Sequence, residues 1–471
     1  MKLSLSMGLG LLIGFSALWI FLGLFWGRKN KSFEDHALAG RNVGLALGAA
    51  TAAATWITSN TTMLAPQFAL QMGVWGMIAY SSAALGLILF APLASRIQIL
   101  MPQGYTSGDF VRLRFGQKTW VLYLILTLFY SLAWLVSMAM AGGVLLQTLS
   151  GIPYVVGMSV ILFVCVVYTM IGGLNAVIGT DFIQSVIILV GIILVAFVAI
   201  DRLPVSVLYE SVSMKAPKLL DVFFPAAILT VCNNFLFGLG EVFHNNVWWS
   251  RAFAMRRGVA GKAFFFGGLL WLPVPVVAGF IALAIFPMNL SLSQPDTVGP
   301  LVVSELLGKG GAVAIFIIVF CSLASSIDSL LASLSDLITE DILSRLVKQK
   351  ESKSDLRRFA QWVTVVLGIV TWFICLPHVG SLAEVLFFAG PLVASMIWPM
   401  IAGLFWDKLH PEGAFWAILL GSTLGLIAYF MIGWYVASLI GATVSMFIMV
   451  AARFYKPISF DWNQLKGGVS R

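Results

Sequence analysis

A run of polar side chains interrupts one of the most apolar parts of the chain. Residues 55–62 contain four threonines, a serine and an asparagine, and Pro66 follows one turn later. Such side chains are poor helix formers because their hydroxyl and amide groups compete for the backbone hydrogen bonds. The run therefore predicts a discontinuous helix whose freed carbonyl oxygens bind a cation. An intact helix whose hydroxyls bond back to its own carbonyls is the alternative.

Serines recur along one face of the apolar segment 311–335. The other serines lie 3, 4, 7 and 11 residues after the first, which draws a line of hydroxyls along a helix. Na⁺ is a hard cation that uncharged oxygens satisfy, so this face suits ion coordination. Hydroxyls also join packed helices, and the spacing leaves both interpretations open. The serines are Ser322, Ser325, Ser326, Ser329 and Ser333; Asp336 continues the line and Asp328 lies off it.

The run 233–246 is a third polar feature within an apolar segment. Gly238 and Gly240 weaken a helix, and Glu241 and His244 lie three residues apart on one helical face. We predict a second interrupted helix here. Glu241 is a candidate to bind a cationic or hydrogen-bonding solute, or to take up a proton as His244 also could. A structural Glu–His pair is the alternative.

The rest of the chain is suited to a lipid environment. Of its 471 residues 60% are hydrophobic and 10% are charged, whereas soluble domains are about a quarter charged. The four cysteines lie within apolar runs without metal-ligand spacing, and no Ser–His or metal-ligand motif indicates an enzyme. We therefore expect an α-helical membrane protein that crosses the bilayer many times and is not an enzyme.

About 20 apolar residues cross the hydrocarbon core of a bilayer, and thirteen segments meet this requirement. With the N-terminus outside, 23 of the 28 lysines and arginines, Arg251 among them, fall in cytoplasmic segments and 5 fall outside. This asymmetry obeys the positive-inside rule, puts the C-terminus in the cytoplasm and explains the net charge of +8 without a nucleic-acid partner. The expected spans are 5–27, 45–72, 75–98, 120–149, 153–171, 180–200, 223–248, 262–286, 311–335, 359–377, 381–406, 412–433 and 435–453.

The two predicted interruptions fall in the second and seventh spans, five helices apart. Interruptions at matching positions of two five-helix units indicate an inverted repeat with a binding site between the units. This inference depends on the positions of the interruptions alone.

Five short motifs follow one another along the chain. They are Leu38-Ala39-Gly40-Arg41 after Phe33 and Asp35, the double glycine Gly172-Gly173 within 168–176, Thr180-Asp181-Phe182-Ile183-Gln184, Trp249-Ser250-Arg251-Ala252, and 399–406 with Gly413-Ala414. In this order they resemble the motifs of the sodium/solute symporter family. The similarity extends from about residue 5 to 430, and the order of the motifs makes it specific.

The resemblance implies an all-α membrane protein with a five-plus-five inverted-repeat (LeuT-like) core, one helix before it and two after it. The corresponding parts are 1–44, 45–200, 201–406 and 407–471. It also implies a sodium site and assigns an aspartate to a second sodium site in some members; a first-turn anion at a helix N-terminus is another interpretation of that aspartate. The implied ligands are the carbonyls of Ala54, Ile57 and Ser322, the hydroxyls of Ser325 and Ser326, and Asp181.

The solute site is placed by position on the interrupted and neighbouring helices. Aromatic walls with few polar groups are typical of small-molecule sites. The candidates are Trp56, Thr58, Asn60, Trp134, Asn234, Glu241 and Phe387. The stretch 243–251 is similar to the urea and polyamine branch of the family, whose members have Asp, Gln and Gln at the positions of Asn245, Asn246 and Ser250.

The sequence thus predicts a sodium-coupled symporter that imports a small organic solute by alternating access. Its expected place is the cell (inner) membrane, with Na⁺, the solute and the lipid bilayer as partners. A proton-coupled transporter of the same fold is one alternative, and a sodium-independent channel or sensor is another.

Overall fold

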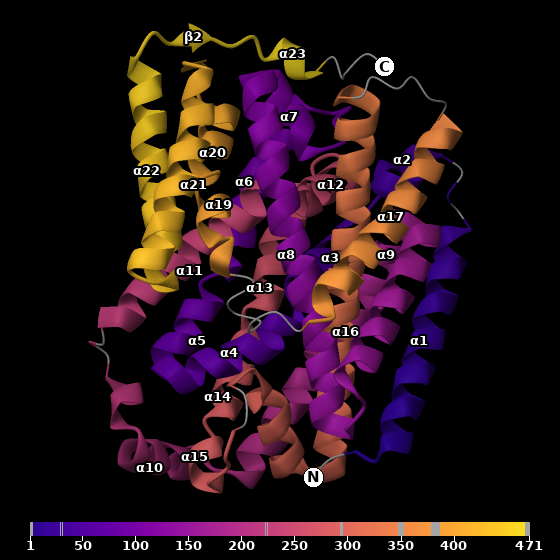
Figure 1. Cartoon of the computed structure of the whole chain (residues 1–471), viewed down its shortest axis with the longest axis vertical. Coiled ribbons are helices and arrows are strands. Elements are labelled where there is room, and N and C mark those ends of the chain that lie inside the picture. Colours follow the sequence, from indigo (N-terminus) through magenta and orange to yellow (C-terminus); the bar gives the residue numbers. More distant parts are fainter. Residues whose placement is uncertain are drawn as a thin grey trace.

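The fold is seen in a computed structural model that describes residues 3–28, 30, 32–221, 223, 225–292, 295–346, 353–377 and 387–466. Within these ranges the regular structure is helical except for two short strands, β1 (Lys408–Leu409) and β2 (Ile458–Ser459), which pair antiparallel. The helices run mostly along the long axis of the molecule (Figure 1). Helix α1 begins at one end of the molecule, and β2 and α23 lie at the other.

The N-terminal half of the chain forms the helices up to α10. They are α1 (Leu5–Gly27), α2 (Phe33–Leu38), η1 (Ala39–Arg41), α3 (Leu45–Trp56), α4 (Ser59–Met72), α5 (Val74–Ser81), α6 (Ala84–Leu100), α7 (Ser107–Phe115), α8 (Gln117–Ser150), α9 (Tyr154–Arg202) and α10 (Val205–Lys215).

The remaining helices continue from η2 to α23. They are η2 (Pro217–Leu220), α11 (Pro225–His244), α12 (Asn246–Ala254), α13 (Ala260–Trp271), α14 (Pro273–Ala282), α15 (Ile285–Met288), η3 (Pro295–Thr297), α16 (Val298–Leu337), the π-helical η4 (Ile338–Leu346), α17 (Lys353–Cys375), α19 (Gly390–Ala394), α20 (Ile397–Phe405), α21 (Glu412–Met431), α22 (Trp434–Phe454) and α23 (Asn463–Lys466).

Among the described residues, ten helices or joined helices are long and apolar enough to cross a membrane. Large apolar side chains cover their outer faces: Ile13, Phe197 and Phe430 are 66%, 72% and 73% exposed. Exposure of this kind would be costly in water, and lipid chains remove the cost. The interior holds the polar side chains instead, including the serine face of α16.

Both predicted helix interruptions are confirmed. The second expected span breaks at Ile57, and Thr58 caps α4 by accepting a 3.1 Å hydrogen bond from the Thr61 amide, while Thr61 Oγ1 accepts one from the Thr58 amide. The seventh expected span breaks at Asn245, whose side chain caps α12 by accepting from the Val247 amide at 3.0 Å. The capping side chains supply partners that the broken helices lack.

The expected spans 153–171 and 180–200 form one long element, α9, with a sharp bend at Gly173. Gly173 has φ +50°, and a Cβ there would lie 2.5 Å from the His36 carbonyl oxygen, so only glycine fits. Since the second part of α9 begins near the bend, Asp181 lies inside the helix and is not in its first turn. Part of the expected span 381–406 lies outside the described residues; its described end forms α19 and α20.

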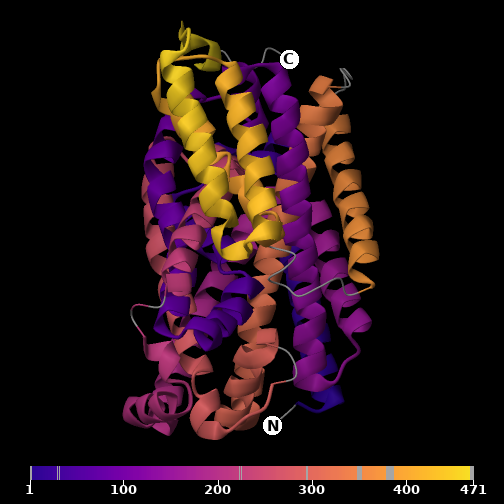
Figure 2. The same ribbon diagram turned by 60° about the vertical axis from the view of Figure 1, so that its left-hand side comes forward.

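Helix α16 lies at the centre of the bundle and positions the site. It packs against α9 and α8, and it contacts both α3 and α4 on the two sides of the first interruption. Helices α21 and α22 pair with each other beside α19, and Figure 2 shows them in yellow, side by side at the front of the bundle. The interrupted helices therefore meet the serine face of α16 inside the protein.

Candidate functional site

The first helix interruption exposes backbone oxygens next to the serines of α16. Among the hydrogen bonds of the described residues, none reaches the carbonyl oxygens of Ala54 or Ile57. The hydroxyl of Ser326 donates to the carbonyl of Thr55 at 3.3 Å, which brings α16 against the broken end of α3. Buried carbonyls normally have a partner. Two carbonyls without one, beside serine hydroxyls, form a neutral oxygen set that fits a monovalent hard cation.

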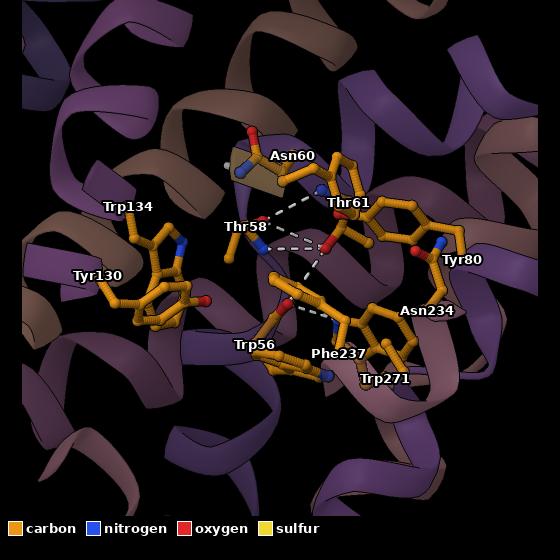
Figure 3. Close-up of a pocket in the computed structure, with 12 residues that line it drawn as sticks. Trp56, Thr58, Asn60, Thr61, Tyr80, Tyr130, Trp134, Asn234, Phe237 and Trp271 are labelled. Carbon is orange, nitrogen blue, oxygen red and sulfur yellow. Dashed lines mark hydrogen bonds between the residues drawn. The ribbon is translucent and has the colours of Figure 1, made fainter. Parts of the chain in front are cut away.

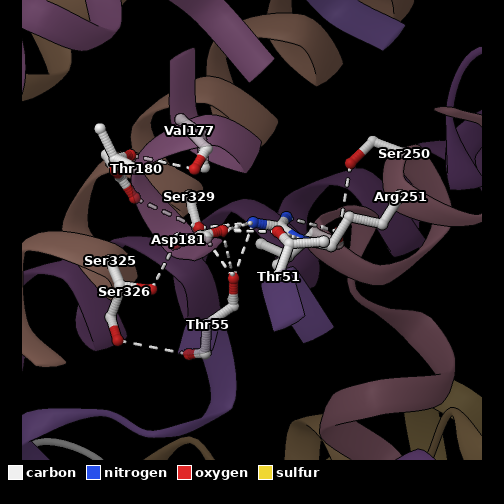
Figure 4. A network of polar contacts seen from close by, with 12 residues as sticks. Thr51, Thr55, Val177, Thr180, Asp181, Ser250, Arg251, Ser325, Ser326 and Ser329 are labelled. Atoms are coloured by element: carbon white, nitrogen blue, oxygen red, sulfur yellow. Dashed lines mark hydrogen bonds and ion pairs between the residues drawn. The ribbon is translucent and has the colours of Figure 1, made fainter. Parts of the chain in front are cut away.

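Asp181, on α9, is hydrogen-bonded to a serine next to this oxygen set (Figure 4). Its Oδ1 accepts a 2.5 Å hydrogen bond from Ser325 Oγ, and its Oδ2 accepts one of 2.5 Å from Thr51 Oγ1. The carboxyl group is fully buried. The predicted ion ligands Ser325, Ser326 and Asp181 are therefore neighbours in space, although Asp181 is 144 residues from Ser325 along the chain.

Arg251 supplies a positive charge to the same network. Its Nη2 lies 3.3 Å from Asp181 Oδ2, and both side chains are 0% exposed. The same nitrogen donates to Thr55 Oγ1 at 2.7 Å and to Ser329 Oγ at 2.6 Å (Figure 4). Asp181 is thus engaged by a buried guanidinium group as well as by hydroxyls.

The prediction that Arg251 follows the seventh span in a cytoplasmic segment was wrong, because Arg251 is not an exposed flanking charge. The chain resumes a helix at Asn246 immediately after the second interruption, so Arg251 lies in α12, where its side chain is fully buried. A buried arginine needs an acid partner, and the separation of 70 residues between Arg251 and Asp181 gave no sign of the pair. A basic residue in an otherwise uncharged helix after an interruption is the signal that would have suggested it.

Asp328 is a second buried carboxyl group next to this network, and its Oδ1 accepts a 3.3 Å hydrogen bond from Ser329 Oγ. Tyr168 donates to Asp328 Oδ2 at 2.7 Å, and Tyr168 also lies 3.2 Å from the Ala324 carbonyl oxygen. These contacts join α16 to the first part of α9, close to the double-glycine bend. Asp328 therefore contributes to the packing of the two helices that carry Asp181 and the serines.

A cavity lies beside the first interruption (Figure 3). Six of the seven predicted solute residues line it, and Glu241 does not. The lining is mainly aromatic, with uncharged polar groups from both interrupted helices. The lining residues are Trp56, Thr58, Asn60, Thr61, Tyr80, Ala83, Tyr130, Trp134, Asn234, Phe237, Trp271 and Phe387.

Glu241 lies one layer behind the cavity wall. Both its carboxyl oxygens accept from Trp248 Nε1 at 3.2 Å, and the Trp248 ring packs edge-on against Trp56 with 5.3 Å between ring centroids. The predicted alternative of a Glu–His pair does not form, because His244 Nδ1 lies 2.6 Å from the Gly240 carbonyl oxygen instead. Glu241 therefore connects the two halves of the second interrupted helix.

The three positions at which the sequence departs from the urea and polyamine branch lie at the second interruption and in α12, and not in the cavity lining. Asn245 caps α12, and Asn246 Nδ2 donates to the Ser333 carbonyl at 3.1 Å. Ser250 donates to the Val247 carbonyl within α12 at 3.2 Å. The three side chains therefore bond to α12 itself and to neighbouring helices, and none of them lines the cavity.

An ionic cluster lies at the end of the bundle near β2 (Figure 1). Arg345 contacts Asp109 and pairs with Glu340 at 3.0 Å and with Asp341 at 3.2 Å. Asp341 Oδ2 also accepts a 2.6 Å hydrogen bond from Thr106 Oγ1. The cluster ties η4, at the end of α16, to the start of α7.

Comparison with known protein families agrees with this geometry. The sequence model of the sodium:solute symporter family matches residues 36–421. The urea-proton symporter DUR3 of Oryza sativa subsp. japonica is 26% identical over 474 residues, covering 91% of this chain and 66% of the relative. The osmoregulated proline transporter OpuE of Bacillus subtilis is 24% identical, covering 87% of this chain and 86% of the relative. This chain spans about two thirds of the length of the curated urea transporters it matches.

Solved structures share the fold. A Na⁺-coupled sialic acid symporter in a substrate-bound outward-open state superposes with a TM-score of 0.81 at 19% identity, covering 96% of this chain and 99% of the other. The nucleobase-cation-symport-1 transporter Mhp1 in a closed conformation gives a TM-score of 0.58 at 14% identity, covering 90% and 95%. At these identities the likeness concerns the arrangement of helices.

Proposed function

The chain belongs to the sodium:solute symporter family, and on this basis we propose that it imports a small organic solute together with Na⁺ by alternating access. Its relatives are membrane transporters and not enzymes, and we assign this chain to the same class of multi-pass transporters. Relatives named for urea and for proline support a small solute.

The observation that carries the proposal is the neutral oxygen set at the first interruption. In our proposal Na⁺ binds the carbonyls of Ala54 and Ile57 and the hydroxyls of Ser325 and Ser326. The carbonyl of Ser322 completes the set, and Asp181 supports it through Ser325. A solved structure that shares the fold is described as a Na⁺-coupled sialic acid symporter, which supports Na⁺ as the ion in our proposal.

Ion and solute are coupled through a short stretch of shared backbone. Ile57, an ion ligand in this proposal, lies between Trp56 and Thr58, which both line the cavity. A cation that fixes this stretch against α16 also fixes the cavity wall. Na⁺ and solute then favour the same conformation, which is the condition for coupling their binding.

The architecture we propose has thirteen spans with a five-plus-five inverted repeat. The interruption between α3 and α4 and that between α11 and α12 are the matching features of the repeats, at 45–200 and 201–406. One helix precedes them within 1–44 and two follow within 407–471. The proposed orientation in the cell inner membrane has the N-terminus outside, supported by the distribution of lysine and arginine.

A thermal-shift screen of the purified protein tests the function. NaCl is crossed with choline chloride and with a panel of urea, polyamines, amino acids, sugars and carboxylates. Stabilisation by a solute only in NaCl is the expected result, because a ligand of the folded state raises its stability. Equal shifts in choline chloride would argue against sodium coupling.

A pair of serine variants tests the site. Ser325→Ala/Ser326→Ala is expected to remove sodium-dependent stabilisation and uptake. Ser335→Ala is the matched control. Ser335 is buried on the same helix, and its hydroxyl donates to the carbonyl of Ala332 within that helix. Full sodium-dependent uptake by the double variant would contradict the assignment of Ser325 and Ser326 as sodium ligands.

The rice relative is named a urea-proton symporter, which keeps proton coupling as the second candidate. Uptake into proteoliposomes separates the two: a sodium gradient at equal pH drives the proposed reaction, and a pH gradient in choline chloride drives the alternative.

A further inference from the structure

A groove of about 710 Å³ lies on the outer face of the bundle, between the first part of α9 and α17. Its walls are mainly apolar, and none of the described residues that line it is charged. Phe163 on α9 and Ile369 on α17 both line the groove and are 64% and 50% exposed. Apolar surface of this kind would be costly in water, whereas lipid chains remove the cost. The groove therefore faces the hydrocarbon part of the bilayer.

Contacts between α9 and α17 form the floor of the groove and fix one of its ends. The helices touch at Gly368, which is buried, and a Cβ there would lie 2.4 Å from Val166 Cγ2. Near the C-terminal end of α17, Trp372 Nε1 donates to Ser159 Oγ at 2.8 Å. From this bond the groove extends along α17 towards Val365 and the start of the helix.

Arg358 lies on the face of α17 that lines the groove. It precedes Val365 and Ile369 by 7 and 11 residues, and both spacings return to the same side of a helix. Seven residues correspond to about 10 Å along the helix axis. Arg358 is exposed, whereas the neighbouring Arg357 donates to the Asn30 carbonyl oxygen at 2.9 Å. A positive charge thus lies in line with the groove, beyond its end at Val365.

The start of α17 places this charge near a membrane surface. Figure 1 shows α17 beginning at the end of the molecule near β2, which is the cytoplasmic end in the proposed orientation. Anionic lipids are concentrated in the cytoplasmic leaflet, where basic residues next to a membrane-spanning helix attract them. The groove and the charge therefore face the two parts of the same lipid leaflet.

We infer that the groove binds one acyl chain of an anionic phospholipid whose phosphate group pairs with Arg358. A phospholipid joins an apolar chain to a phosphate through glycerol, so its two parts match an apolar groove and a positive charge about 10 Å beyond it. The lipid would contact both proposed repeats, because α9 belongs to 45–200 and α17 to 201–406. The inference goes beyond the proposed function and takes from it only the orientation.

Native mass spectrometry of the full chain in detergent tests the phosphate site. The protein is titrated with phosphatidylglycerol and with phosphatidylcholine that carry the same acyl chains. Phosphatidylglycerol is expected to bind with an about fivefold lower Kd, which corresponds to about 1 kcal/mol for one basic residue near the membrane surface. Arg358→Gln is expected to abolish this preference. Arg257→Gln is the matched control, because Arg257 is also exposed but lies between α12 and α13.

A second pair of variants tests the groove. Ile369→Trp fills it and is expected to weaken the binding of both lipids roughly tenfold, the effect of displacing about two buried CH₂ groups. Val366→Trp adds the same bulk to α17 at a position that is 55% exposed and does not line the groove, so it is expected to bind both lipids as the wild type does. An unchanged Tm in detergent shows that each variant is folded.

Each outcome decides the inference without reference to sodium or solute. Equal affinities of the wild type for the two lipids, or a preference that survives Arg358→Gln, would overturn the phosphate site. Wild-type lipid binding by a folded Ile369→Trp protein would overturn the groove. A dimer that Ile369→Trp disrupts and that added lipid leaves intact would assign the groove to a second copy of the chain instead. Since the titrations contain neither Na⁺ nor solute, their failure would leave the proposed function standing.

Discussion

Replacing Asp181 by asparagine separates the two roles that the structure gives this carboxyl group. Asp181 faces Arg251 at 3.3 Å with both side chains fully buried, and it also accepts from the proposed sodium ligand Ser325 at 2.5 Å. Asparagine keeps the size of the side chain but removes the charge, so Arg251 stays buried without an acid partner. Removing one partner of a buried pair costs about 3–5 kcal/mol. The variant is expected to lose stability of this order before any sodium is added.

A double-mutant cycle measures the ion pair itself. Asp181→Asn, Arg251→Met and the double variant are unfolded with a denaturing detergent in choline chloride, and the free energies of unfolding are compared. The double variant buries neither charge, so it is expected to lose about 2–3 kcal/mol less than the sum of the single variants. Asp201→Asn, at an exposed position on α9, is the control and is expected to change stability by less than about 0.5 kcal/mol.

The same proteins titrated with NaCl report on the ion site. Saturating sodium at about 100 times its dissociation constant is expected to stabilise the wild type by about 2.7 kcal/mol, and Asp181→Asn is expected to lose most of this gain. Additive losses in the cycle, or an Asp181→Asn protein as stable as the wild type in choline chloride, would refute the ion-pair reasoning. An unchanged sodium response would refute a part for Asp181 in the ion site.

Three further predictions concern other parts of the fold. Gly173→Ala is expected to destabilise the protein by about 1–3 kcal/mol, measured as a lower Tm, because alanine is strained at φ +50° and its Cβ meets the His36 carbonyl; an unchanged Tm would contradict the bend. Arg345→Ala is expected to raise deuterium exchange in 104–116 and 333–346, because it removes the ion pairs that hold η4 against α7, and exposed Arg358→Ala is the control. Equal exchange in both variants would show that the cluster does not hold η4 against α7. Burial, together with the positive charge of Arg357, lowers the pKa of His36 from 6.5 to about 4. Between pH 4 and pH 6.5 the unfolded chain therefore binds a proton at His36 that the folded chain does not. Stability is then expected to fall by about 3 kcal/mol as the pH drops from 6.5 to 4, and His36→Leu is expected to flatten this part of a Tm–pH curve; an equally steep curve for His36→Leu would assign the loss to other groups.

The sequence by itself determined the membrane class and the local breaks in the helices. Composition and the length of apolar runs are local properties, and lipid selects for them directly. The interruption near Ile57 was predicted for the same reason, because threonine and serine side chains act on the backbone beside them. Six of the seven solute candidates line one cavity since they were chosen by position on the interrupted helices and their neighbours.

Only the tertiary structure decided which partner each buried polar group has. Nothing in the local sequence pairs Arg251 with Asp181, 70 residues away, or turns Glu241 towards Trp248 and away from His244. Such choices depend on how α9, α12 and α16 pack, and a charge inside a bundle takes whichever opposite charge the packing brings within reach. Trp56 Nε1, Asn60 Nδ2 and Asn234 Oδ1 are buried without a hydrogen-bond partner. The sequence could not predict this, because a missing partner can be recognised only when all neighbours in space are known.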